Sequence, residues 1–144
     1  MKVFVDSNVF ISASVKNHPK HDRASRWLAN ARQKKTQLYT SAHSLLDVYS
    51  VLTRAPFQPP FSPKAASEVI EKNIVGHFKI IDLSASESLE IIQNMVAKNL
   101  RGGIIYDAVL VKCAQKAGIR NIATLNPKHF TRLLPDDSYS IITF

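Results

Sequence analysis

Four side chains with oxygen atoms that could act in catalysis occupy positions just after, or within, apolar segments of the chain. Asp6 directly follows a short apolar run, residues 2–5, and Asn126 comes two residues after a second such run, 121–124. Asp47 and Asp107 interrupt apolar segments, 45–49 and 104–110. Carboxylates are rare among apolar neighbours unless they are paired or bind a ligand. Asp6, Asp47, Asp107 and Asn126 are therefore the candidate catalytic residues.

Three carboxylates brought together would select a particular kind of cofactor. They would repel one another and raise one another's pKa unless a cation neutralised them. Because no Cys or His cluster accompanies them, oxygen ligands favour Mg²⁺ or Mn²⁺ over zinc or copper. Such an ion also binds phosphate oxygens, so the pattern indicates hydrolysis of a phosphodiester.

Each carboxylate also has a purely structural interpretation. Asp6 could cap the helix that follows it, and Asp107 lies in a first helical turn, where the helix dipole favours a negative charge. Asp47 shares a helix face with Ser44, Ser50 and Arg54, which could be a solvated polar stripe. The sequence alone does not show that the three carboxylates converge.

Alternating short strands and helices must position these residues. Strands are expected at 2–5, 38–40, 78–81, 121–124 and 139–143. Helices are expected from about residue 9, after His18-Pro19, and over 42–54, 63–75, 84–99 and 104–117, with a proline-rich loop near 56–63. Leu89, Ile92, Met95 and Val96 should form the buried face of the helix 84–99. This alternation predicts an α/β fold with a mainly parallel sheet covered on both faces, and sites form beyond the carboxyl ends of such strands.

Composition limits the remaining possibilities. The chain has 144 residues, 19 Lys and Arg against 11 Asp and Glu, and a formal charge of +8. This length predicts a single domain over residues 1–144, and one cysteine excludes an intrachain disulfide framework. With no long apolar stretch and no secretory leader pattern, we expect a soluble cytoplasmic protein without membrane contact. The positive excess is consistent with a polyanionic partner or with solubility alone.

The four candidate residues lie in segments that resemble a known family. Residues 3–10, 44–54, 102–108 and 123–130 resemble, in order, the four sequence motifs of the PIN-domain nucleases. The motifs together span most of the chain. In its motifs and its length, the chain is most similar to the VapC-type toxins of bacterial and archaeal toxin–antitoxin pairs.

The resemblance implies a fold, an activity and partners. The fold would be a three-layer α/β/α sandwich with a mainly parallel sheet of four to five strands. The protein would be an Mg²⁺- or Mn²⁺-dependent endoribonuclease, usually a homodimer, inhibited by a small cognate antitoxin. Asp6, Asp47 and Asp107 would bind the metal, Asn126 would take the fourth motif position, and Asn8 and Thr124 would be supporting hydrogen-bonding residues.

Two positions depart from the family pattern. The second motif more often carries Glu, and Asp47 is one methylene shorter; the fourth position is often Asp, and Asn126 is neutral. One firmly bound ion is therefore expected rather than two. These departures also leave open a catalytically weakened module that only binds RNA or protein. A phosphatase that uses Asp6 as its nucleophile is disfavoured, because Ser7 and Asn8 stand where such sites usually carry a second acid.

Basic residues near the motifs are candidates for holding RNA. Arg54, Lys128 and Arg132 could contact the RNA backbone, and His129 could contact a substrate phosphate. His43 also lies near the expected site and could likewise contact a substrate phosphate. Cys113, within an apolar helix, is expected to be a core residue.

Overall fold

Five short strands form one parallel sheet in the computed structural model, which describes residues 1–144. The strands are β1 (Lys2–Val5), β2 (Gln37–Ser41), β3 (Lys79–Ile81), β4 (Asn121–Ala123) and β5 (Ser140–Ile142). Their order is β3-β2-β1-β4-β5, and every neighbouring pair is parallel. The predicted parallel sheet of four to five strands is confirmed.

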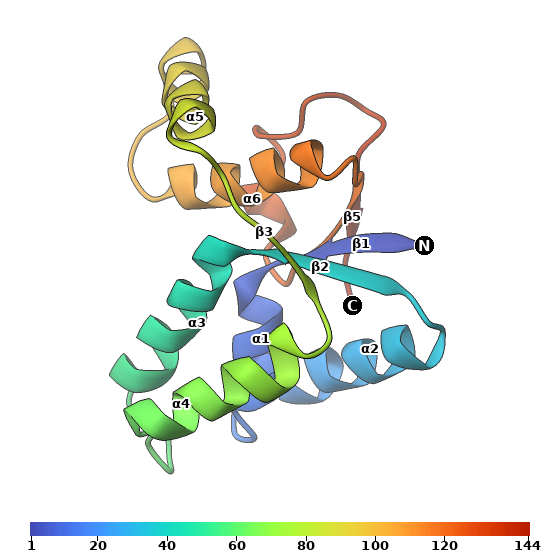
Figure 1. The fold of residues 1–144 in the computed structure, drawn as a ribbon, viewed down its shortest axis with the longest axis vertical. Helices are drawn as coiled ribbons and strands as arrows, with labels where there is room; N and C mark the ends of the chain where they lie inside the picture. Colours follow the sequence, from blue (N-terminus) through green and yellow to red (C-terminus); the bar gives the residue numbers. More distant parts are fainter.

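Helices cover both faces of this sheet (Figure 1). On one face lie α1 (Ser7–Ser14), α2 (His21–Gln33), α3 (Ala42–Arg54) and α4 (Pro63–Val69), and on the other lie α5 (Ala85–Ala97) and α6 (Ile104–Lys116). A π-helical segment, η1 (Ile70–Val75), continues α4, and a 3-10 turn, η2 (Pro127–His129), follows β4. The arrangement is the three-layer α/β/α sandwich that was expected. None of the helices is both long and apolar enough to cross a membrane.

The sheet separates two hydrophobic cores, and β1 contributes to both. Val3 and Val5 pack with α1, α2 and α3, whereas Phe4 packs with α5 and α6. Successive side chains of a strand point to opposite faces, so a strand covered on both sides must be apolar throughout. Cys113 of α6 is buried in the second core, as predicted.

Serine side chains fix the starts of three helices. Ser41 accepts a hydrogen bond from the backbone N–H of Ser44 at the start of α3, and Ser62 caps α4 in the same way. At α5, Ser84 and Glu87 form a reciprocal capping box. Because these caps depend only on local residues, the starts of α3 and α5 agree with the sequence prediction.

The predicted buried face of α5 is confirmed at Met95 and wrong at its other three residues. Ile91 and Met95 are the buried residues, while Leu89, Ile92 and Val96 are exposed by 60%, 48% and 75%. The large apolar residues cover about half of the circumference of this helix, so their spacing does not fix which part is buried, and packing against α6 selects Ile91 and Met95.

Candidate active site

The candidate site lies where the strand order reverses. β1 has β2 on one side and β4 on the other. The carboxyl ends of β1 and β4 therefore lie side by side at the same edge of the sheet. Asp6 follows β1, and its backbone N–H donates to the carbonyl of Ala123 at 3.0 Å. This hydrogen bond places the first and fourth predicted motifs side by side. Crevices at such reversal points are the usual ligand sites of open α/β sheets.

The Thr124 hydroxyl joins three of the predicted site residues. Thr124 is fully buried, and its Oγ1 donates to Oδ2 of Asp6 at 2.8 Å. The same oxygen accepts from the backbone N–H of Asn126 at 3.0 Å and from Nδ2 of Asn8 at 3.3 Å. Oδ1 of Asn8 in turn accepts from the backbone N–H of Leu125 at 3.3 Å. Thr124 and Asn8 thus hold Asp6 and the segment after β4 in a fixed relation.

Ser7 brings the second motif to the first. Its Oγ lies 3.3 Å from Oδ2 of Asp47 and 3.4 Å from Oδ1 of Asp6, so one hydroxyl is shared between the two carboxylates. Ser7 was not among the predicted site residues. Its position directly after Asp6 was the only available signal, because the contact to Asp47 spans 40 residues of chain.

Asp47 faces this cluster from α3 and is half-buried. The interpretation of its helix face as a solvated stripe fails at Ser44, which is buried and shares a 2.8 Å hydrogen bond with the side chain of Ser41. Ser50 and Arg54, further along the same face, are exposed. The stripe is therefore solvated only in its second half, beyond the carboxylate.

Asp107 enters from the first turn of α6, and its pKa is raised to about 6. Partial burial is the main cause, and the negative charges of Asp6 and Asp47 add to it. His129 opposes the shift, with its Nδ1 3.5 Å from Oδ2 of Asp107. The structure thus brings Asp107 within electrostatic reach of both other carboxylates.

The pKa of Asp6 is also raised, chiefly by burial. The Thr124 hydroxyl and nearby backbone N–H groups oppose this, and the charge of Asp47 adds to it. Asp6 occupies the N-cap position of α1, yet its side chain makes no capping hydrogen bond. Helix capping alone therefore does not explain this buried carboxylate, whose Oδ2 accepts from Thr124 instead.

The carboxylate oxygens of this site suit a hard cation that keeps part of its water shell, rather than an ion coordinated only by protein. No group of three or more His, Cys, Asp or Glu side chains is placed so that all of them could hold one metal ion. Mg²⁺ usually retains several waters and is held by one or two carboxylates together with substrate phosphates. Asp6 and Asp107 fit such an ion, because neighbouring carboxylate charge adds to the rise in the pKa of each and a bound cation would relieve that repulsion.

The five residues that follow Thr124 line a small hollow that contains no carboxylate, and one of them, His129, lies 3.5 Å from Asp107. Asn126, Lys128 and His129 share a hollow of about 240 Å³ with Leu125 and Pro127. Arg132 is exposed beyond it, and its carbonyl accepts from Nζ of Lys98 at 3.0 Å. Arg54 is more remote, because it lies seven residues beyond Asp47, or about 10 Å along the helix axis.

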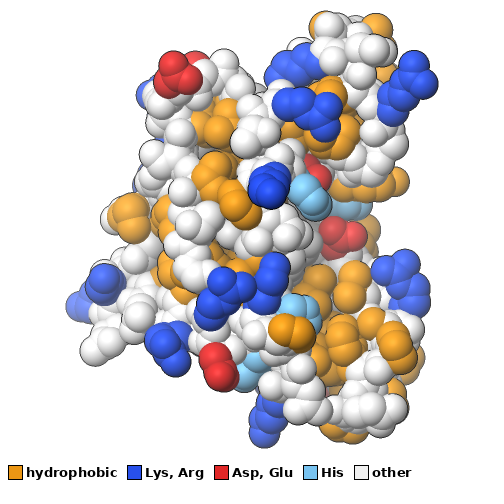
Figure 2. All heavy atoms as spheres, turned by 180° about the vertical axis from the view of Figure 1, so that it is seen from behind, with side chains coloured by type: hydrophobic (Ala, Val, Ile, Leu, Met, Phe, Trp, Pro, Cys, Tyr) orange, Lys and Arg blue, Asp and Glu red, His pale blue; other side chains and the backbone are white.

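The molecular surface shows the same arrangement (Figure 2). Acidic and histidine side chains lie together in the indentation between the part formed by α5 and α6 and the part formed by α3 and α4. Lys and Arg side chains stand around this indentation. Negative charge inside and positive charge outside would hold a cation and a polyanion next to each other.

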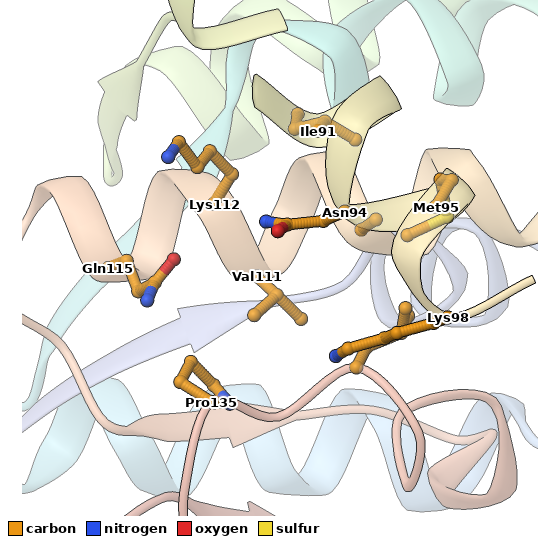
Figure 3. A pocket seen from close by; sticks show the side chains of 10 residues that line it. Ile91, Asn94, Met95, Lys98, Val111, Lys112, Gln115 and Pro135 are labelled. Atoms are coloured by element: carbon orange, nitrogen blue, oxygen red, sulfur yellow. The ribbon is translucent and has the colours of Figure 1, made fainter. Parts of the chain in front are cut away.

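A separate hollow of about 250 Å³ lies between α5, α6 and the segment before β5 (Figure 3). Ile91, Met95 and Val111 line it together with the polar side chains of Asn94 and Gln115. None of the predicted site residues lines it, and it contains no carboxylate. It is therefore distinct from the acidic site.

Known proteins share both this sequence pattern and this fold. The family model described as the PIN domain matches residues 3–133. Ribonuclease VapC27 of Mycobacterium tuberculosis (strain ATCC 25618 / H37Rv) is 27% identical over 111 residues, which cover 76% of this chain and 74% of that protein.

Solved structures agree with the family match. The structure of VapBC2 from Rickettsia felis, bound to a DNA fragment from its promoter, has a chain with a TM-score of 0.70 and 18% identity, covering 100% of this chain and 99% of that one. VapC20 of M. tuberculosis, a sarcin–ricin loop cleaving toxin, has a TM-score of 0.67 and 20% identity, covering 83% of this chain and 86% of that one. The match over residues 3–133 assigns the chain to the PIN domain family.

Proposed function

We propose that this protein is a metal-dependent endoribonuclease and the toxin of a toxin–antitoxin pair, with residues 1–144 as its single domain. The observation that supports the proposal is that Asp6 and Asp47 share the Ser7 hydroxyl and that the charges of both reach Asp107, at the reversal point of the sheet. Such mutually repelling carboxylates are costly to the fold unless they bind a cation. Strongly perturbed pKa values in a cleft are typical of functional sites.

Mg²⁺ or Mn²⁺ at this site would supply charge neutralisation for a phosphodiester and activation of a water molecule. Asp6 and Asp107 would hold the ion, with Asp47 holding it directly or through water. Thr124 and Asn8 would orient Asp6 through the hydrogen bonds described above. Asn126 would offer a neutral carbonyl oxygen at the fourth position. A low negative charge in this set favours one firmly bound ion.

RNA is the substrate that the surrounding charge supports. Lys128 and His129 border the hollow next to Asp107, where a phosphate could be placed beside the carboxylates. Arg132 and Arg54 would contact the backbone further from the scissile bond. The relatives named as a ribonuclease and as a sarcin–ricin loop cleaving toxin support this substrate class.

A small antitoxin and a second copy of the chain are the proposed protein partners. The VapBC2 structure and that of FitAB bound to a DNA fragment have TM-scores of 0.70 and 0.69 to this chain. We propose an equivalent complex here, formed in the cytoplasm. Co-purification with the product of an adjacent short reading frame would test it, and recovery of this chain alone after co-expression would count against the antitoxin.

Cleavage of RNA by purified protein tests the proposed activity. Total cellular RNA is incubated with wild-type protein and Mg²⁺ or Mn²⁺, with EDTA, and with two variants. Asp6→Asn should lower the rate by more than about 100-fold, since it removes a ligand rather than a supporting residue. Asp137→Asn is the matched control, because Asp137 is exposed and lies outside all four motifs. Intact RNA with wild-type protein, or equal cleavage by Asp6→Asn, would contradict the proposal.

A further inference from the structure

An exposed tyrosine stands next to the candidate metal site. Tyr106 immediately precedes Asp107 on α6, and 58% of its surface is exposed. Its ring is parallel to that of His43 on α3, with an interplanar angle of 4° and 5.1 Å between ring centroids. No function described above uses this pair.

The stacked pair lies at the same end of the molecule as the carboxylates. His43 precedes Asp47 by four residues, and residues four apart share a face of a helix. Tyr106 adjoins Asp107, so the ring stack connects the two helices that carry the second and third acidic motifs. The stacked pair is therefore positioned by α3 and α6, the helices that also carry two of the proposed metal ligands.

The geometry leaves one flat surface of the tyrosine free. His43 covers one face of the ring, so the large exposure of Tyr106 belongs to the opposite face and the ring edge. His43 is itself half-buried, and its buried Nε2 has no hydrogen-bond partner. The imidazole thus supports the tyrosine with its ring face, which limits the motion of Tyr106 before any ligand arrives.

We infer that Tyr106, supported by His43, stacks against an unpaired base of the RNA next to the phosphodiester that is cut. This inference rests on the proposed ribonuclease function and deepens it. Single-stranded RNA is commonly recognised by stacking of splayed bases on aromatic side chains. Stacking accepts any base and is worth about 1–3 kcal/mol per base, equivalent to about 5- to 150-fold in affinity. It would require a single-stranded or loop substrate, because a base within a duplex cannot reach the ring.

Binding of two oligonucleotides isolates the stacking contribution. The first is an oligoadenylate of about 12 nucleotides, and the second has the same ribose–phosphate backbone without bases. Their dissociation constants are measured by fluorescence anisotropy in the Asp6→Asn background, which prevents cleavage. Tyr106→Leu should weaken oligoadenylate binding about tenfold and leave binding of the abasic chain unchanged. Tyr106→Phe and Tyr106→Trp should restore oligoadenylate binding.

Tyr49→Leu is the matched control, because Tyr49 is exposed on α3 and Asp47, two residues earlier, points to another side of that helix. It should leave both dissociation constants unchanged.

Equal loss of affinity for both oligonucleotides on Tyr106→Leu, or no loss for either, would overturn the stacking role. If wild-type protein cleaves RNA with Mg²⁺ while Tyr106→Leu keeps its preference for bases, only the stacking inference fails. If wild-type protein does not cleave but the preference depends on Tyr106, only the proposed nuclease function fails.

Discussion

The hydroxyl of Thr124 donates a 2.8 Å hydrogen bond to Oδ2 of Asp6, although 118 residues of chain separate the two. Thr124 follows β4 and Asp6 follows β1, so the bond crosses the point where the strand order reverses. The bond lowers the pKa of Asp6 against the larger effect of burial, which raises it. It therefore favours the ionised carboxylate that a metal site requires.

Removing this hydroxyl should damage both the fold and the site. In Thr124→Val, the backbone N–H of Asn126 and Nδ2 of Asn8, both partly buried, lose their acceptor. We expect the free energy of unfolding to fall by about 1–3 kcal/mol, measured by urea denaturation. We also expect the Mg²⁺ affinity or the cleavage rate to fall by about 10- to 100-fold.

Thr124→Ser provides the control for this experiment, because serine retains the hydroxyl and removes only a methyl group. It should retain the metal affinity and lose a smaller part of the stability. Equal loss of metal affinity in the serine and valine variants would show that packing, rather than the hydrogen bond to Asp6, sets the affinity.

The raised pKa of Asp107 predicts how stability depends on pH. In the unfolded chain its pKa is near 3.8, and in the folded chain it is about 6. Above about pH 6 the carboxylate is ionised in both states, and the folded state bears the cost of burial and repulsion. As the pH falls from about 6 toward 4, the folded state binds more protons than the unfolded state. The free energy of unfolding of the metal-free protein should therefore gain a contribution from Asp107 on acidification.

Asp107→Asn removes this contribution. In EDTA at pH 7 the variant should be more stable than wild type by about 1–3 kcal/mol, and the difference should vanish near pH 4. Chemical denaturation at several pH values measures this. Mg²⁺ should stabilise wild type at pH 7 more than the variant. A variant that is less stable than wild type at pH 7 in EDTA would contradict the assignment of Asp107 as a repelled carboxylate.

The basic side chains around the site should make RNA binding sensitive to salt. For single strands, the slope of log K against log salt concentration changes by about 0.7 for each phosphate contact. We expect Lys128→Ala and Arg132→Ala each to reduce the slope by about this amount, and Arg54→Ala to do so only with longer RNA. Anisotropy titrations across salt concentrations measure it.

Lys116→Gln is the control for the salt experiment. Nζ of Lys116 already pairs with Glu87 at 2.9 Å and donates to the carbonyl of Asp82, so it should not contact RNA. An unchanged slope in both Lys128→Ala and Arg132→Ala would place the RNA path elsewhere on the surface.

The sequence predicted the strands and most helix boundaries because these depend on local signals. Ser41 and Ser84 cap their helices through residues three positions away. The apolar run before Asp6 could only be a strand covered on both faces, and β1 is covered in this way. The general rule for α/β sheets then predicted a site at the carboxyl ends of the strands, whereas the strand order, and with it the reversal point, came only from the structure.

The sequence could not predict contacts that depend on how helices rotate against one another. Large apolar residues cover about half of the circumference of α5, and only its packing on α6 selects Ile91 and Met95 for burial. The shared hydroxyl of Ser7 and the parallel rings of His43 and Tyr106 likewise join residues from distant segments. Neither pair has a spacing signature in the chain.

The central claim is that Asp6 and Asp107 hold a divalent cation, and calorimetric titration of the RNA-free protein with Mn²⁺ tests it directly. We predict one saturable site per chain in wild-type protein, retained in Asp137→Asn. Asp6→Asn and Asp107→Asn should each weaken that site by at least about tenfold. Mn²⁺ binding of equal strength in wild type and both site variants, or no saturable binding in wild type, would contradict the assignment.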